Sequence, residues 1–224
     1  MPGNSFRNHT TLLGQLLGEQ RLQVANQYNA SGSLAGYLYQ CRLALLLAIR
    51  EMKVKPNCHI SIEKFDDIAF HEEDLAHCVV QAKHHIGPKD VTDNSVDVWK
   101  TLRIWISQLR TGSFSNADTR RFLITTATTP DDGVLAMLRA NCGPAERKTA
   151  RAAGGGGAHI GQQVIRGGRN DFLALTDEEA DVLLASITVV DGAPDLLLTK
   201  SKASFASYRP VPPIRLRNHL KAGG

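Results

Sequence analysis

Two short segments carry acidic, amide and basic side chains at spacings suited to metal-dependent hydrolysis. The residues are Asp67 in the segment 60–70, and Gln81 and Lys83 in the segment 77–85. Both segments have the composition of strands, in which residues two apart share a face. Paired as a hairpin, the strands are expected to bring the three side chains together with Glu63 nearby, because neighbouring strands lie about 4.8 Å apart.

Such a cluster suits hydrolysis of a phosphodiester. A carboxylate and a side-chain carbonyl are hard oxygen ligands for Mg²⁺, which polarises a phosphate and lowers the pKa of a bound water. A lysine two residues after a ligand orients that water or stabilises charge on the phosphate. The alternative is an exposed hairpin with ordinary polar side chains. The doubled Asp66-Asp67, the apolar strand context and a preceding helix favour the site.

The elements that must position these residues follow from the pattern along the chain. Ser31 or Ser33 caps a helix to Met52, and a second helix covers 95–109. Between them lie the two strands, joined by the acidic connection 71–76. The later elements are a strand at 121–126, a flexible glycine-rich insertion at 142–169, a helix opened by the capping box Thr176–Glu179 and ending near 185, and a short strand at 187–190.

This order predicts an α/β (α+β) fold with a small central mixed sheet flanked by helices. We expect an N-terminal arm at 1–30, a folded domain at 31–205 and a basic irregular tail at 206–224. The 224 residues are 42% hydrophobic and 21% charged, as in ordinary soluble proteins. The longest apolar run, 43–49, is far shorter than the roughly 20 residues that span a bilayer, so a cytoplasmic protein without membrane contact is predicted.

Charge is distributed unevenly along the chain. Residues 196–224 hold six Lys/Arg and no acids, whereas residues 60–98 hold nine Asp/Glu and three Lys. Basic side chains that could contact phosphate are Lys100, Arg103, Arg110, Arg209, Arg215 and Arg217; a solvated basic face is the alternative. Trp99, with Leu102 and Ile106 on the same helical face, is expected in the core. Four scattered cysteines without C-x-x-C disfavour a zinc site.

Several of these segments resemble the D…(E/Q)-x-K core of the PD-(D/E)XK nucleases. More specifically, they resemble the effector endonuclease of CD-NTase-associated antiphage systems, a domain that also begins larger antiphage NTPases. The resemblance covers about 31–126 and, more faintly, 172–190. The matching segments are GYLYQ (36–40), EKFDDI (63–68), VVQAKH (79–84) and VWKTL (98–102).

The resemblance implies a role for each matching residue. Asp67 corresponds to the metal-binding aspartate, Gln81 stands at the (D/E) position, and Lys83 is the catalytic lysine. Glu63 and Gln40 match positions that support the metal site. Gln81 departs from the acidic form of the motif, and since an amide oxygen is a poorer cation ligand than a carboxylate, metal binding would depend mainly on Asp67 and Glu63.

The resemblance further implies a restriction-endonuclease-like core and a Mg²⁺-dependent endonuclease, with Mn²⁺ as a substitute, that cuts double-stranded DNA. Such an enzyme would be an effector of bacterial antiphage defence, active as a homo-oligomer and paired with a sensor or NTPase. The alternative is a catalytically degenerate nucleic-acid-binding or assembly module of the same fold, which the neutral Gln81 leaves open.

Overall fold

The computed structural model describes residues 31–51, 55–72, 75–85, 90–112, 118–154 and 163–197. The chain divides into two compact units, Met1–Leu38 and Tyr39–Gly224. Within the first unit only residues 31–38 are described, and they are helical. The predicted arm at 1–30 and tail at 206–224 lie outside the described residues.

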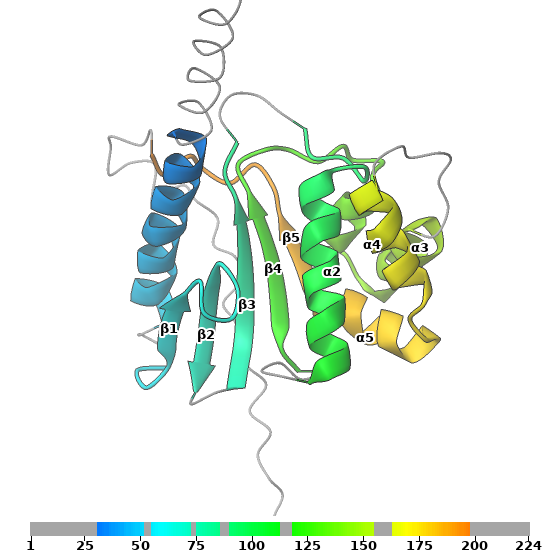
Figure 1. Cartoon of the computed structure of the whole chain (residues 1–224), viewed down its shortest axis with the longest axis horizontal. Coiled ribbons are helices and arrows are strands. Elements are labelled where there is room, and N and C mark those ends of the chain that lie inside the picture. The colour runs from blue at the N-terminus through cyan, green and yellow to red at the C-terminus, as the bar shows by residue number, and fades with distance from the viewer. Residues whose placement is uncertain are drawn as a thin grey trace, which may run out of the picture. The chain divides into compact units, whose positions relative to one another are not determined.

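The centre of the second unit is a five-stranded mixed sheet (Figure 1). The three strands β1, β2 and β3 pair antiparallel, and β3, β4 and β5 pair parallel. This architecture confirms the predicted α/β class and the small mixed sheet. In spatial order the strands are β1 (His59–Ile62), β2 (Ile68–Glu72), β3 (Leu75–Lys83), β4 (Arg120–Thr125) and β5 (Ile187–Val190).

Helices cover both faces of the sheet. Parallel neighbours need crossover connections, and these form one layer on one face: α2 (Val96–Thr111), η1 (Val134–Leu138), α3 (Pro144–Gly154), α4 (Gln163–Leu173) and α5 (Asp177–Ser186). On the other face, Tyr39, Leu43 and Leu47 of the helix Ser31–Glu51 pack against the sheet residues Val80 and Ile124. The core is therefore two apolar layers separated by the sheet.

The predicted strand at 60–70 is wrong in one respect, because a turn interrupts it. Residues 63–67 connect β1 to β2, and the Glu63 N–H donates to the Asp67 carbonyl at 3.2 Å. Glu63 has a φ of 58°, in the left-handed region that breaks the alternation of a strand. The alternation nonetheless resumes in the same phase after the turn, because Ile62 pairs with Ile68 and Ile60 with Phe70, and these four side chains lie on one face of the sheet.

The glycine-rich region 142–169 also differs from its prediction as a flexible insertion. Helices α3 and α4 occupy most of it, and residues 155–162 lie outside the described residues. These helices form because Ala150, Ile165 and Phe172 find places in the core. Gly168 permits the close packing of α4 on α2: a Cβ there would lie 3.0 Å from the Trp99 ring.

The remaining predicted elements are confirmed within one or two residues. Helix α2 follows Ser95, and helix α5 opens with both hydrogen bonds of the Thr176–Glu179 capping box. Trp99 is 5% exposed and belongs to the core, as predicted.

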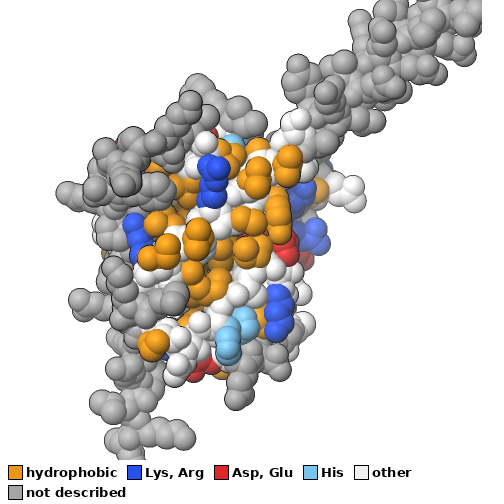
Figure 2. All heavy atoms as spheres, turned by 90° about the vertical axis from the view of Figure 1, so that its left-hand side faces the viewer, with side chains coloured by type: hydrophobic (Ala, Val, Ile, Leu, Met, Phe, Trp, Pro, Cys, Tyr) orange, Lys and Arg blue, Asp and Glu red, His pale blue; other side chains and the backbone are white. Residues whose placement is uncertain are grey.

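One described helix, Ser31–Glu51, has the length and apolar composition of a membrane span. Of its most apolar 18 residues, 22% are buried in the protein. Core helices of soluble proteins and signal sequences near an N-terminus have the same length and apolar composition. Figure 2 views the molecule from the side on which this helix lies and shows hydrophobic side chains gathered on that surface. Leu45 and Ile49 of this helix are 63% and 53% exposed.

Candidate active site

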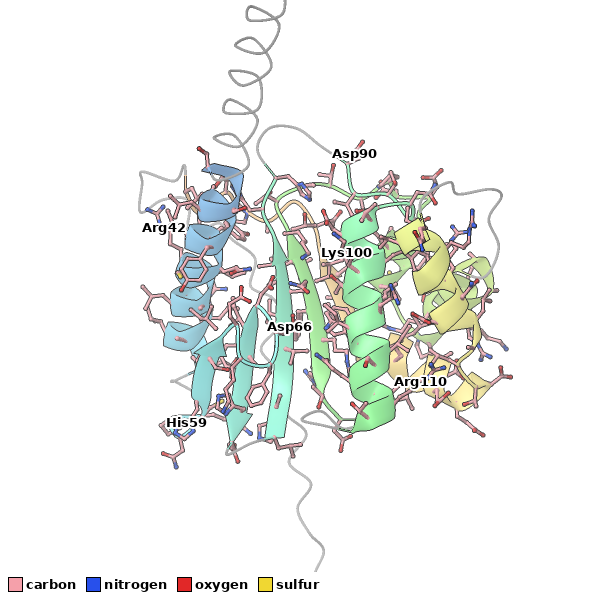
Figure 3. All side chains as sticks on the ribbon, in the orientation of Figure 1. Arg42, His59, Asp66, Asp90, Lys100 and Arg110 are labelled. Atoms are coloured by element: carbon pink, nitrogen blue, oxygen red, sulfur yellow. The ribbon has the colours of Figure 1, made fainter. Side chains whose placement is uncertain are left out.

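The turn at 63–67, the end of β3 and one side of α2 enclose an open cleft of about 420 Å³. It is lined by Glu63, Lys64, Phe65, Asp66, Asp67, Gln81, Lys83, Lys100, Thr101 and Ile104. Four of the predicted site residues, Asp67, Gln81, Lys83 and Glu63, thus come together in one place. In Figure 3, Asp66 and Lys100 mark the side of the cleft formed by the turn and the side formed by α2.

Strand β3 contributes Gln81 and Lys83 to this cleft. As residues two apart they point to the same side of the sheet, the side covered by α2. Gln81 is only 4% exposed, and its Oε1 lies 3.4 Å from the Thr101 hydroxyl, whose single proton is shared between this oxygen and the closer Asp97 carbonyl at 2.9 Å. The amide is therefore oriented by the helix, with its oxygen toward the cleft-lining Thr101.

Asp67 directly precedes β2 and is held against β3. The antiparallel register pairs Ile68 with Val80, which brings Asp67 beside Gln81. Its Oδ2 accepts a hydrogen bond of 2.8 Å from the Ala82 N–H. One carboxylate oxygen is thus occupied by the backbone, and the other can bind a cation or water.

Asp66 is the most perturbed group in the cleft. Burial raises its pKa to about 6, and the nearby charge of Asp67 adds to the rise. Hydrogen bonds from the Trp105 Nε1–H (2.8 Å) and the Asp67 N–H (3.0 Å), together with the charge of Lys83, act in the opposite direction. A strongly shifted carboxyl beside a lysine in a cleft is typical of a functional site.

Helix α2 contacts the turn and the end of β3 through one line of side chains. Thr101, Trp105 and Gln108 recur at helical spacing, and they donate to Gln81, Asp66 and the Phe65 carbonyl respectively. Sequence reasoning used Asp66 only as the neighbour of Asp67 and gave it no role of its own, and it missed Trp105 altogether. The pattern of three hydrogen-bond donors on one face of α2 could have indicated them.

The side-chain oxygens in the cleft suit a Mg²⁺ ion whose other ligands are water and the substrate. Among the described residues, no three His, Cys, Asp or Glu side chains are grouped to hold a metal ion. The cleft offers instead the hard oxygens of Asp67 and Gln81, with Glu63 on the same lining. Mg²⁺ usually keeps several waters and binds through one or two carboxylates plus substrate phosphates, so these residues are sufficient as protein ligands.

Other predicted residues lie elsewhere. Gln40 is on the helix that packs against the opposite face of the sheet, and it does not line the cleft. Arg103 forms an ion pair with Asp171 at 2.7 Å, and Arg110 donates to the Ala174 carbonyl at 3.0 Å. Lys100 lines both the cleft and a groove along α2. Arg209, Arg215 and Arg217 lie outside the described residues.

Comparison with known proteins found no relative of this chain. No family model matches the chain, and neither a curated protein nor a solved structure matches it.

Proposed function

We propose that this chain is a Mg²⁺-dependent endonuclease, with Mn²⁺ as a substitute, that hydrolyses phosphodiester bonds of double-stranded DNA on a restriction-endonuclease-like core. One observation carries the proposal. Asp67, Gln81 and Lys83, chosen by residue type and spacing, line a single cleft, with Asp67 at the end of the turn that directly precedes β2.

Each residue has a distinct task in this proposal. Asp67 and Gln81 bind the ion, with Glu63 as a further carboxylate; when bound, Mg²⁺ polarises the phosphate and lowers the pKa of a water. Lys83 stabilises the charge that develops on the phosphate, because its ammonium lies on the same side of β3 as the ligands. Asp66, with a pKa of about 6, is suited to accept a proton near neutral pH.

A path for the DNA backbone adjoins the cleft. The groove along α2 has a volume of about 910 Å³ and shares Lys100 and Ile104 with the cleft. Its lining also holds Arg103 and Arg110. Basic side chains in a line beside the reacting centre supply contacts that are independent of sequence.

The biological setting is part of the same proposal. We place the enzyme in the bacterial cytoplasm as an antiphage effector, without membrane contact, that works with a sensor or NTPase. One cleft cuts one strand at a time, so double-strand breaks favour a homo-oligomer on activation. The exposed Leu45 and Ile49 offer apolar surface for such an assembly.

The test is a plasmid-cleavage assay with Mg²⁺ and with EDTA. Asp67→Asn and Lys83→Met are expected to lower cleavage about a hundredfold or more, with little change in melting temperature. Asn is preferable to Ala at 67 because its side-chain oxygen still accepts from the Ala82 N–H. The matched control is Lys148→Met on the exposed surface of α3. Substantial Mg²⁺-dependent cleavage by either cleft variant would contradict the proposal.

A second candidate is a catalytically degenerate nucleic-acid-binding or assembly module. The neutral Gln81, together with the lack of a three-carboxylate group among the described residues, favours it. This candidate predicts DNA binding that EDTA does not weaken, and no cleavage with either Mg²⁺ or Mn²⁺.

A further inference from the structure

A second cavity, of about 400 Å³, lies within the helical layer and is unrelated to the predicted site residues. It is bounded by α2, by side chains of α3, α4 and α5, and by the sheet residues Leu123, Ile187 and Val189. The residues that matter for its chemistry are Trp99, Trp105, Leu123, Ala150, Phe172 and Leu184, all less than 8% exposed.

The lining is apolar and rich in aromatic rings. Its charged members are Asp93, Asp132 and Arg169, of which Asp132 is exposed to solvent. The Asp93 carboxylate accepts the backbone N–H groups of Val134 and Leu135, at 2.9 and 3.2 Å. Both oxygens of this carboxylate are thus engaged with backbone N–H groups of the protein, and Thr101 is the buried polar side chain among the otherwise apolar α2 members of the lining.

The size and the lining define the class of ligand. The volume lies in the range typical of small-molecule sites, roughly 300–1,000 Å³. It is also two to three times that of the roughly 150 Å³ cavity that accepts benzene. We infer that this cavity binds an uncharged apolar small molecule, the size of a fused ring system or a short alkyl chain, and that its occupancy acts on the cleft through α2.

The link to the cleft is physical and short. Thr101 and Trp105 both line the cavity. The Thr101 hydroxyl also lies 3.4 Å from Gln81 Oε1, and the Trp105 indole donates to Asp66 at 2.8 Å. A molecule that contacts the Trp105 ring from the cavity side displaces the donor that holds Asp66 on the other side. The effect on cleavage, but not binding itself, rests on the proposed function.

Binding can be measured without DNA or metal. Trp99 and Trp105 are the two tryptophans of the chain and both line the cavity. We would titrate the full chain with 1-bromoadamantane, whose bromine quenches tryptophan fluorescence on contact. Saturable quenching is expected. Ala150→Leu, which adds volume at a residue 1% exposed, should weaken it at least about tenfold, whereas the control Ala152→Leu, exposed on the same helix, should not.

Leu184→Phe fills the cavity from α5 and serves as the second variant if Ala150→Leu does not fold. Quenching of the wild type that stays linear up to the solubility limit of the probe would overturn the inference. So would an unchanged dissociation constant in the folded filling variants.

The coupling is followed by two further measurements. The Trp105 indole N–H resonance, assigned with Trp99→Phe, should shift as the probe saturates. Plasmid cleavage by the wild type should change at least about fivefold, and cleavage by the filled variants should not. An unmoved Trp105 resonance would contradict coupling. If the wild type never cleaves, the proposed function is wrong, while the quenching and resonance measurements still decide this inference.

Discussion

The indole N–H of Trp105 donates a hydrogen bond of 2.8 Å to Oδ2 of Asp66, and this bond joins the middle of α2 to the turn before β2. A buried carboxylate without such a donor would lose an interaction worth about 1.5–3 kcal/mol. The bond therefore both orients Asp66 and opposes the rise in its pKa that burial causes.

Removing the Trp105 donor should harm the cleft more than the fold. Trp105→Phe keeps a buried ring and is expected to cost about 1–3 kcal/mol in the free energy of unfolding. Cleavage should fall about tenfold or more, because Asp66 and the turn lose their orientation. The control is Trp99→Phe, which removes the bond from Trp99 to the Asp93 carbonyl (2.7 Å) but leaves the turn untouched. Equal loss of cleavage in both variants would contradict this role.

The raised pKa of Asp66 predicts a specific dependence of stability on pH. An aspartate titrates near 3.9 when unfolded and at about 6 here, so the folded chain binds more protons between these values. Its contribution to stability is therefore greatest below pH 4, declines through pH 4–6 and is constant above. Asp66→Asn cannot ionise and should gain about 2–3 kcal/mol over the wild type between pH 4 and pH 7.

This comparison is made by urea denaturation in EDTA at several pH values. The exposed Asp132→Asn is the control and should follow the wild type. Parallel curves for Asp66→Asn and the wild type would show that Asp66 ionises normally.

Restoring the acidic form of the motif should exchange stability for metal affinity. Gln81→Glu places a carboxylate at a site 4% exposed, beside Asp66 and Asp67, and is expected to cost about 1–3 kcal/mol without metal. Mg²⁺ should then raise the melting temperature of the variant by several degrees more than that of the wild type. Gln108→Glu, 6% exposed on α2, is the control: it should lose stability without recovery by Mg²⁺.

The position of Lys100 predicts its contribution to DNA binding. Its side chain borders both the cleft and the groove along α2. Lys100→Ala should weaken binding to all sequences alike and reduce the slope of log K against log salt by about 0.9 for each phosphate that the lysine neutralises. Fluorescence anisotropy over a salt series measures this slope, with Lys148→Ala as control. An unchanged slope would show that the DNA does not pass Lys100.

The sequence predicted a side chain's position best where alternation within a single strand decides which face of the sheet it lies on. Gln81 and Lys83 share a face because they are two residues apart, and this holds within any regular strand. Asp66 escaped the same reasoning because it lies inside the turn that begins at Glu63, with a φ of 58°, where strand alternation does not place side chains. Trp105 escaped it because its partner is 39 residues away and is brought near by packing alone.

Composition was likewise a poor guide to the glycine-rich region. Glycine is unfavourable within a helix by about 1 kcal/mol relative to alanine, which favours a loop on local grounds. Gly168 nonetheless lies within α4. Glycine is needed there because a side chain at that position would collide with Trp99. The benefit of bringing α4 against α2 is not visible in a local pattern.

The mixed sheet has a consequence for the order in which the chain folds. Strands β1, β2 and β3 are neighbours in sequence and can pair early, whereas β5 joins β4 only after α3, α4 and α5 have been made. The cleft residues therefore leave the ribosome well before the helices that pack against α2. Because α2 holds Asp66, we expect a growing chain to lack an ordered cleft until α5 and β5 have been made. Pulse-labelled hydrogen exchange during refolding should accordingly protect amides of β3 before those of β5.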